Sequence, residues 1–280
     1  MRNCSYDIDD RKSRMEIAFV CNDAYACHLS VTIASILRNA DPNDNFSFHV
    51  LTDDLTIEKQ EKICSLSYIR DFAIDFKYVD ASLFDKYPLM LHFSRQTYYR
   101  FLIPFFYTEH EKILYLDSDL IVRGSLRRLY NTNFCGRYAV VVRGAGHAAE
   151  GARRLGLKNY FNAGVMLINL RKWIADDIGN KLFANTEILA QREMIKAADQ
   201  CVLNFSLNDE VVFVENKFNF TLGHYQQWVQ CRGEKKLGMK DIPDVLVAHF
   251  TSGEKPWTPR CSHPFKDEYF YYLRLTPFSD

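Results

Sequence analysis

Short apolar runs alternate with segments of helical periodicity along the chain, and this alternation constrains the fold more than any other feature. The apolar runs of strand length in the first half are residues 15–21, 46–51, 73–79 and 112–116. Amphipathic segments separate them at residues 28–39, 56–69 and 94–107, the last broken or bent at Pro104. Parallel strands are buried on both faces and need helical crossovers. The pattern therefore predicts an α/β fold in which helices flank a mostly parallel, mixed sheet.

The second half of the chain continues the pattern without a visible domain boundary. Further strand candidates are residues 138–142, 165–170, 211–214 and 245–250, and helix candidates are residues 177–196 and 199–207. The 280 residues suffice for one large domain or two small ones, and no repeat, low-complexity tract or Gly/Ser linker divides them. We therefore predict a polar extension at residues 1–14, one α/β domain at residues 15–260 and an aromatic-rich tail at residues 261–280.

The charge balance and the cysteine pattern narrow the class of protein. Lys+Arg and Asp+Glu both number 35, so the net charge is zero and a protein that grips nucleic acid is not expected. The eight cysteines are scattered without a CxxC pair, as in reduced proteins. The first 14 residues are too polar for a signal peptide, and no apolar run has the length of a membrane span. We therefore expect a soluble cytoplasmic protein.

Two carboxylates follow the apolar strand KILYL, at Asp117 and Asp119, with Ser118 between them. In an open α/β sheet, ligands bind at the carboxyl ends of the strands. Two carboxylates on one turn offer hard oxygen ligands to Mg²⁺ or Mn²⁺, which also bridge diphosphate oxygens. Taken alone, a solvated turn that closes the strand explains the triplet more economically.

A histidine and a lysine occur together near the last strand candidate. His249 belongs to residues 245–250, and the loop after it contains Gly253 and Lys255. Neutral imidazole suits Mn²⁺ beside carboxylates, and a lysine suits a phosphate. A core histidine and a solvated lysine are the alternative for this segment alone.

Small residues precede the strand at residues 165–170. Asn162, Ala163 and Gly164 form a predicted turn there, and small side chains let a ligand approach the backbone closely. The alternative is a plain turn before a core strand.

Together these segments resemble a known family. In order along the chain, DSD after KILYL, YFNAGVMLINL, the Asp199-Gln200 pair and HFTSGEKPW are similar to the bacterial family 8 glycosyltransferases. The resemblance runs from about Met15 to about Trp257 and is strongest to the lipooligosaccharide α-galactosyltransferase group, with glycogenin and galactinol synthase more distant. It implies a Rossmann-like nucleotide-sugar-binding domain of the GT-A type.

The resemblance also implies roles for individual residues. Asp117, Asp119 and His249 match ligands of Mn²⁺, with Mg²⁺ as the alternative ion, and Lys255 matches a lysine that holds the donor diphosphate in a closing loop. The other implied donor-binding residues are Val20, Asn22, Tyr25, Arg100, Ser118, Asn162, Ala163 and Gly253. Asp199 and Gln200 match the catalytic, sugar-facing pair. Residues 89–94 match a second lid segment, in which His92 falls at the position of a histidine.

Two positions depart from the family pattern. The first loop often reads Asp-Asp-Asn-Tyr, whereas this chain has Asn22-Asp23-Ala24-Tyr25, and Ala24 offers no hydrogen bond to a ribose. The family loop His-x-x-Gly has its glycine one place later here, at Gly253. These departures bear on how the nucleotide is held.

The resemblance implies retaining transfer of glucose or galactose from a UDP donor to a glycan or lipid-linked saccharide. A double displacement needs a carboxylate nucleophile, but Gln200 is an amide and Asp199 matches a residue that grips sugar hydroxyls. We therefore expect front-side attack by the acceptor hydroxyl. Two alternatives stay open: a metal-dependent phosphoesterase acting on nucleotide diphosphates, and a catalytically silent protein that binds UDP-sugars.

The tail at residues 261–280 contains six aromatic residues flanked by Lys266 and Arg274. Aromatic and basic tails can lie in a membrane interface, which would place the protein at the inner face of the membrane. The alternative is a terminal helix that packs on its own domain.

Overall fold

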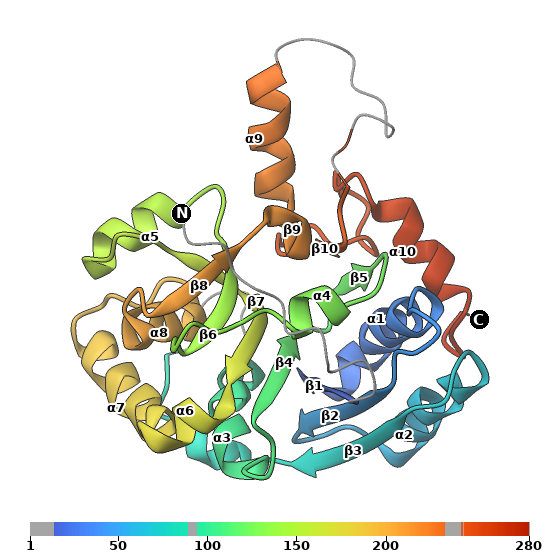
Figure 1. Cartoon of the computed structure of the whole chain (residues 1–280), viewed down its shortest axis with the longest axis horizontal. Helices are drawn as coiled ribbons and strands as arrows, with labels where there is room; N and C mark the ends of the chain where they lie inside the picture. The colour runs from blue at the N-terminus through green and yellow to red at the C-terminus, as the bar shows by residue number, and fades with distance from the viewer. Residues whose placement is uncertain (1–13, 89–93, 233–241, 243, 280) are drawn as a thin grey trace.

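Seven strands form the central sheet of the protein, whose computed structural model describes residues 14–88, 94–232, 242 and 244–279 (Figure 1). The strands are β1 (Met15–Val20), β2 (Phe46–Thr52), β3 (Ala73–Tyr78), β4 (Lys112–Leu116), β6 (Ala139–Arg143), β7 (Phe161–Asn169) and β8 (Val211–Val214). Their order is β3-β2-β1-β4-β7-β6-β8. Only β7 runs antiparallel to its neighbours among these seven strands. The predicted α/β fold with a mostly parallel, mixed sheet is confirmed.

Helices flank this sheet on both sides (Figure 1). The α-helices of the described residues are α1 (Ala26–Arg38), α2 (Ile57–Cys64), α3 (Ile103–Phe106), α4 (Arg127–Tyr130), α5 (Ala148–Leu155), α6 (Leu170–Ala175), α7 (Ile178–Gln191), α8 (Ala198–Leu207), α9 (Leu222–Arg232) and α10 (Lys266–Leu273). Of these, α9 and α10 lie away from the central sheet (Figure 1). In Figure 1, α1 and α2 lie beside the β1–β3 half of the sheet, and α6, α7 and α8 lie beside the half that contains β7.

Strand β4 shows why the strands read as continuous apolar runs. Successive side chains of a strand point to opposite faces of the sheet. Ile113 and Tyr115 enter the core cluster that contains residues of α7 and α8, whereas Leu114 and Leu116 enter the cluster that contains residues of α1. Because both faces are covered by helices, the four residues of β4 after Lys112 are all buried and mostly apolar.

A smaller sheet stands next to the central one and positions the predicted site. It consists of β5 (Leu120–Val122), β10 (Val247–His249) and β9 (Phe220–Thr221), in the order β5-β10-β9. In the antiparallel pair of β10 and β5, His249 lies opposite Leu120. This register brings His249 beside the two carboxylates that precede β5.

Several sequence expectations about elements are wrong in detail. Residues 162–164 are not a turn but part of β7, opposite a register shift in β6 between Val141 and Val142. Residues 94–107 form a 3₁₀ helix (Arg95–Leu102) and then α3, and Pro104 lies in the first turn of α3, where its missing N–H is tolerated. The helix expected to reach residue 196 ends at Gln191. The patterns also missed the short elements α4, α5, α6, α9, β5 and β9.

The C-terminal tail forms α10, which packs against α1 and the smaller sheet. Phe265, Tyr269 and Tyr272 are buried in a cluster with Val31 of α1 and Phe250. The Tyr269 hydroxyl lies 2.7 Å from His28 Nδ1. These three aromatic side chains of the tail therefore pack within the protein.

Two general properties of the described residues bear on the expectations about compartment. Each cysteine in the described ranges is free. Within those same ranges, no helix combines the length and the apolar character that crossing a bilayer requires.

Candidate active site

A cavity of about 1200 Å³ opens at the carboxyl ends of β1 and β4. Its lining includes all fourteen predicted site residues: Val20, Asn22, Tyr25, Arg100, Asp117, Ser118, Asp119, Asn162, Ala163, Asp199, Gln200, His249, Gly253 and Lys255. Ser94 also lines it, but the rest of the predicted lid, residues 89–93 with His92, lies outside the described residues. The tertiary structure thus brings together residues that are up to 235 positions apart, from Val20 to Lys255.

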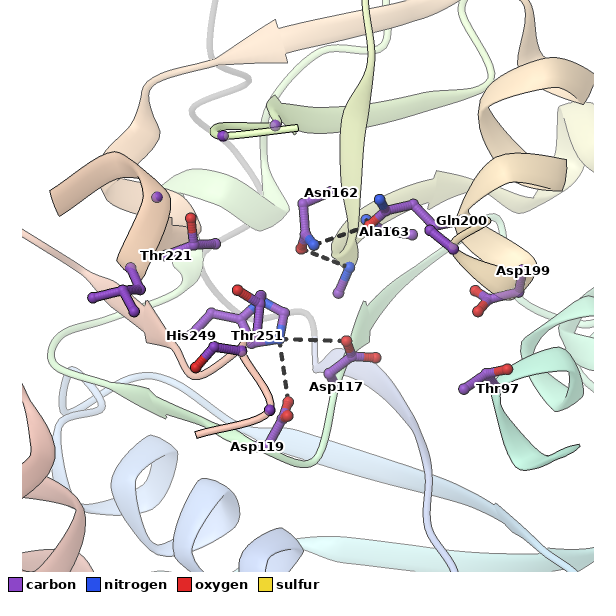
Figure 2. A pocket seen from close by; sticks show the side chains of 18 of the residues that line it. Thr97, Asp117, Asp119, Asn162, Ala163, Asp199, Gln200, Thr221, His249 and Thr251 are labelled. Carbon is purple, nitrogen blue, oxygen red and sulfur yellow. Dashed lines mark hydrogen bonds and ion pairs between the residues drawn. The ribbon is translucent and has the colours of Figure 1, made fainter. Parts of the chain in front are cut away.

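Asp117, Asp119 and His249 form one cluster of candidate metal ligands (Figure 2). His249 Nε2 lies 3.1 Å from Asp119 Oδ1 and 3.4 Å from Asp117 Oδ2. One ligand atom from each residue lies within 4.8 Å of the other two. Two carboxylates and an imidazole suit Mn²⁺, and Mg²⁺ accepts the carboxylates. The donor set therefore fits a divalent ion and does not by itself select which one.

Gly164 of β7 allows this close approach. The backbone of β7 lies directly beside the cluster, because Asp117 N–H donates to Gly164 O at 2.8 Å. A Cβ at position 164 would lie 2.1 Å from His249 Cε1 and 2.4 Å from Asp117 Oδ2. No side chain larger than that of glycine fits at this position with the cluster unchanged.

The α1 helix holds the turn that carries the carboxylates. Thr32, fully buried in α1, donates its hydroxyl to Leu120 O at 2.7 Å and lies 3.1 Å from Ser118 O. Ser35 Oγ accepts from Val122 N at 2.8 Å. Ser118 itself donates its hydroxyl to Val20 O at 2.7 Å, so its side chain ties the end of β4 to the end of β1. Sequence reasoning missed Thr32 and Ser35, which look like ordinary helix residues.

Cations surround the two carboxylates. Arg100 Nη2 donates to Asp117 Oδ1 at 3.0 Å, and the guanidinium stacks 4.2 Å from the centre of the Tyr115 ring. Burial raises the pKa of Asp117, but Arg100 and His249 outweigh it and hold that pKa below its usual value. Burial also raises the pKa of Asp119, but Lys255 and His249 outweigh it and hold that pKa below its usual value, so both carboxylates stay ionised.

Burial lowers the pKa of His249, but Asp117 and Asp119 raise it to about 9. Binding of a divalent ion at this imidazole therefore releases a proton.

Lys255 reaches the same carboxylates from the loop after β10. Its ammonium group contacts Asp119 Oδ2 and donates to Phe250 O. Burial lowers the pKa of Lys255, but Asp119 raises it above its usual value, so the side chain is charged. The site thus holds a lysine ammonium group beside the candidate metal ligands, where a diphosphate would meet both.

At the other end of the cavity, Gln200 is held by two hydrogen bonds to its side-chain oxygen. Ala163 N–H donates to Gln200 Oε1 at 3.1 Å, and Asn162 Nδ2 donates to it at 3.0 Å (Figure 2). Because the backbone N–H can only donate, the orientation of the amide is determined. Both lone-pair positions of the oxygen are engaged, which makes it a fixed dipole and a poor nucleophile.

Asp199 is buried at this end, apart from the metal cluster and beside Thr97 (Figure 2). Arg100 Nε lies 3.0 Å from Asp199 Oδ2, but the single Nε–H donates to Thr97 O at 3.2 Å. Among the described residues, no donor makes a hydrogen bond to Asp199 Oδ2. Burial raises the pKa of Asp199 to about 6, partly offset by Arg100. Asp199 lines the cavity, so a rotation of its carboxylate would bring this oxygen to a ligand hydroxyl.

Asn219, which the sequence analysis missed, connects the two ends of the site. His249 Nδ1 lies 2.9 Å from Asn219 Oδ1, and Asn219 Nδ2 donates to Asn162 Oδ1 at 2.9 Å. Asn162 in turn donates to Gln200, as described above. The candidate metal ligand and the sugar-facing amide therefore belong to one hydrogen-bonded chain, His249–Asn219–Asn162–Gln200. Asn219 precedes a strand of only two residues, so no sequence pattern marks it.

The third part of the cavity is aromatic. Trp257 stacks on His28 with ring centres 3.4 Å apart and 11° between the planes, and Tyr25 meets Trp257 edge to face. Tyr25 was predicted, whereas the role of His28 was not. Flat aromatic surfaces at the end of β1 suit a planar base.

Comparison with known proteins agrees with this geometry. The sequence model of glycosyl transferase family 8 matches residues 16–261. The chain belongs to this family. The solved structure of the galactosyltransferase LgtC, in complex with donor and acceptor sugar analogues, matches this family 8 chain with a TM-score of 0.82 at 27% identity, covering 94% of this chain and 96% of that one. The fold is accordingly of the GT-A type.

Curated relatives of the family 8 chain are longer or of similar length. The lipopolysaccharide 1,3-galactosyltransferase of Salmonella typhimurium is 28% identical over 279 residues, which cover 95% of this chain and 80% of the relative. Glycosyltransferase GlyE of Streptococcus pneumoniae is 29% identical over 251 residues, covering 88% of this chain but only 58% of the relative.

Proposed function

We propose that this family 8 chain is a retaining glycosyltransferase that moves glucose or galactose from a UDP-sugar to a saccharide or glycolipid acceptor. One observation carries the proposal. A single cavity combines a divalent-ion ligand set and a lysine at one end with buried hydroxyl-binding groups, Asp199 and Gln200, at the other. A nucleotide diphosphate bonded to a sugar spans these two chemistries. The names of the lipopolysaccharide galactosyltransferase relative and of LgtC support the same substrate class.

The leaving group is proposed to lie against Asp117, Asp119, His249 and Lys255. Asp117, Asp119 and His249 would hold Mn²⁺, or alternatively Mg²⁺, and a bound ion neutralises negative charge on the departing diphosphate. Lys255 adds a second positive charge, because its ammonium group already lies at Asp119 and can turn to a phosphate oxygen. The base is proposed to lie near Val20, Asn22 and Tyr25.

The sugar is proposed to lie against Arg100, Asn162, Ala163, Asp199 and Gln200. The Asp199 carboxylate accepts a hydrogen bond from a sugar hydroxyl. The Arg100 guanidinium holds Asp199 and Asp117 in place through its ion pairs with both. The side-chain oxygen of Gln200 stabilises positive charge at the anomeric carbon by its dipole, with no covalent bond, since Ala163 N–H and Asn162 already occupy it. We therefore propose attack by the acceptor hydroxyl on the face that the diphosphate leaves.

The two alternatives make different products. A phosphoesterase cleaves the diphosphate and releases UMP, whereas a transferase without acceptor releases UDP and free sugar. A silent binding protein releases neither. The buried Asp199 carboxylate, paired with Arg100 and set apart from the metal ligands (Figure 2), favours an enzyme that recognises the sugar over a phosphoesterase that needs only the diphosphate.

The location of the protein in the cell follows from the proposed acceptor. We propose a cytoplasmic protein whose glycolipid acceptor brings it to the inner face of the membrane. Peripheral contact through the C-terminal tail would have to use the side chains that α10 leaves outside its core cluster, such as Tyr271, which is 43% exposed.

The test is product analysis with UDP-glucose and UDP-galactose, Mn²⁺ and a lipooligosaccharide-type acceptor. We expect UDP release that needs the ion, and proton NMR of the first product should show an α-linked hexose. Asp119→Ala should abolish turnover, and Lys255→Ala should lower turnover more than donor affinity. Release of UMP, a β-linked product, or equal UDP affinity with Mn²⁺ and with EDTA would refute the proposal.

A further inference from the structure

A second cluster of metal-ligating side chains lies at the opposite end of β1 from the cavity. In the parallel sheet, Ala18 of β1 pairs with His49 of β2, and His49 pairs with Asp75 of β3. Paired residues of neighbouring strands point to the same face, as does Glu16, two residues before Ala18. Glu16, His49 and Asp75 therefore form a polar row on one face of the sheet. His110, from the turn before β4, covers this row.

The ligand atoms of Glu16, His49 and His110 converge. His49 Nε2 lies 2.8 Å from Glu16 Oε2, and His110 Nε2 lies 3.9 Å from the same oxygen. All three atoms lie within 4.8 Å of one another. Ligands at the bond lengths of a four-coordinate zinc ion are about 3.3 Å apart. The separations of 2.8 and 3.9 Å lie on either side of that value, so small side-chain rotations would complete a tetrahedral site.

The other ring nitrogen of His49 is held as metal-bound histidines usually are. His49 Nδ1 is hydrogen-bonded to the carboxylate of Asp75, whose second oxygen accepts from the Tyr107 hydroxyl at 3.4 Å. The Tyr107 ring packs 4.5 Å from the His49 ring. A carboxylate on Nδ1 orients the ring and directs the Nε2 lone pair toward a metal ion. This arrangement is independent of Glu16 and His110, and it points to the same ligand atom.

We propose that Glu16, His49 and His110 bind a zinc ion, separate from the ion of the active site. Two imidazoles and one carboxylate are a common zinc donor set, and the fourth position is open to water or to Glu109, whose Oε1 lies 3.4 Å from His110 Nε2. His49 is buried, while His110 is 22% exposed at its side chain, so an ion enters from the side of the turn. The ion ties β1 and β2 to the turn that leads into β4. Its proposed role is structural, because it would fix the turn from which β4 runs to Asp117 and Asp119.

The experiment is metal titration of the full-length, metal-stripped chain carrying Asp117→Asn and Asp119→Asn, which silence the active-site ligands. Zn²⁺ binding is measured by calorimetry, and Co²⁺ serves as a visible probe, because a tetrahedral site absorbs far more strongly than an octahedral one. We expect one tightly bound equivalent with a tetrahedral Co²⁺ spectrum. Adding His110→Ala should abolish that equivalent, and Asp75→Asn should weaken it about 10- to 100-fold.

Two further variants keep the result decisive. Glu16→Gln retains the size of the side chain and removes a ligand charge, so it should also abolish binding if His110→Ala does not fold. Glu111→Gln is the matched control, since this nearby carboxylate pairs with Arg171 and should leave binding unchanged. Absence of bound metal in the parent chain, or binding that His110→Ala and Glu16→Gln leave intact, would show that the cluster is only an ion-pair network and would overturn the proposal.

Discussion

A missing Cβ at position 164 determines how closely His249 approaches Asp117. The space that a methyl group would need is already filled by the imidazole and a carboxylate oxygen, at 2.1 and 2.4 Å. Gly164→Ala should therefore displace His249 and abolish Mn²⁺-dependent UDP binding, measured by calorimetry. Gly124→Ala is the control, because its Cβ meets only the flexible Leu246 Cδ1 at 3.1 Å. Unchanged binding in Gly164→Ala would mean that His249 is not a ligand.

Asn219 is expected to orient His249 without touching the metal ion. Asn219→Ala removes the hydrogen bond to His249 Nδ1 and the one to Asn162 Oδ1. Loss of such an outer partner costs metal affinity about 10- to 100-fold, so Mn²⁺ affinity should fall within that range. Electron paramagnetic resonance of free Mn²⁺ measures it without any turnover. The exposed neighbour Asn216→Ala should bind Mn²⁺ as the unmodified chain does.

The raised pKa of Asp199 should be visible in the dependence of stability on pH. Its pKa is about 6 in the folded protein and 3.8 in the unfolded chain. Between these two pH values the folded protein keeps the Asp199 proton, whereas the unfolded chain has released it. The contribution of Asp199 to the free energy of unfolding should thus fall as pH rises from about 4 to about 6, by on the order of 3 kcal/mol. Urea unfolding of the chain and of Asp199→Asn measures the difference at each pH. Parallel curves for the two proteins would contradict the shift.

At the scale of elements, α1 does more than cover the sheet. Its buried hydroxyls bond to backbone groups of the turn after β4 and of β5: Thr32 donates toward Ser118 O and Leu120 O, and Ser35 accepts from Val122 N. This explains why a polar residue such as Thr32 is tolerated with no solvent exposure. The position of the DSD turn depends on a helix that lies more than 80 residues earlier in the chain.

Thr32→Val should therefore lower both stability and metal affinity. The substitution keeps the shape of the side chain but leaves buried carbonyl groups without a donor, at a cost of about 1–3 kcal/mol in the free energy of unfolding. The matched control is Thr186→Val in α7, equally buried, where the hydroxyl donates only to Leu182 O within the helix. If both variants lose the same stability and keep Mn²⁺ affinity, the turn does not depend on α1.

At the scale of the whole molecule, the last helix closes the core cluster under the smaller sheet. Phe265, Tyr269 and Tyr272 bury their rings there, and Asn39 Nδ2 of the α1 C-cap donates to the Tyr272 hydroxyl at 2.7 Å. Full burial of one such side chain stabilises by about 1.5–3 kcal/mol. Three of them approach the total stability of a typical domain.

Removal of residues 261–280 should consequently leave a chain that fails to fold cooperatively, as circular dichroism during heating would show. Tyr271→Ala is the control, because this side chain is 43% exposed and should change the midpoint little. A truncated chain that unfolds like the full one and still binds UDP with Mn²⁺ would show that the tail serves another purpose, such as membrane contact.

The sequence by itself determined the fold class and the members of the main cavity. Apolar side chains recur every few residues within a strand or a helix, so the local sequence pattern reveals these elements. Four motifs in a fixed order identified the family. All fourteen predicted residues line one cavity, although their individual roles stay predictions. The turn predicted at residues 162–164 is wrong, because a glycine that makes room for a crowded site looks in sequence like a glycine in a turn.

Only the tertiary structure decided which residues support that cavity. The hydroxyl of Thr32 meets a carbonyl 88 positions away, Asn219 meets a histidine 30 positions away, and His28 meets a tyrosine 241 positions away. A single hydrogen bond between distant residues leaves no periodicity, because each partner occupies one position in an otherwise ordinary helix or strand. The same reason hid Glu16, His49 and His110, which become neighbours only when β1, β2 and the turn before β4 are placed side by side.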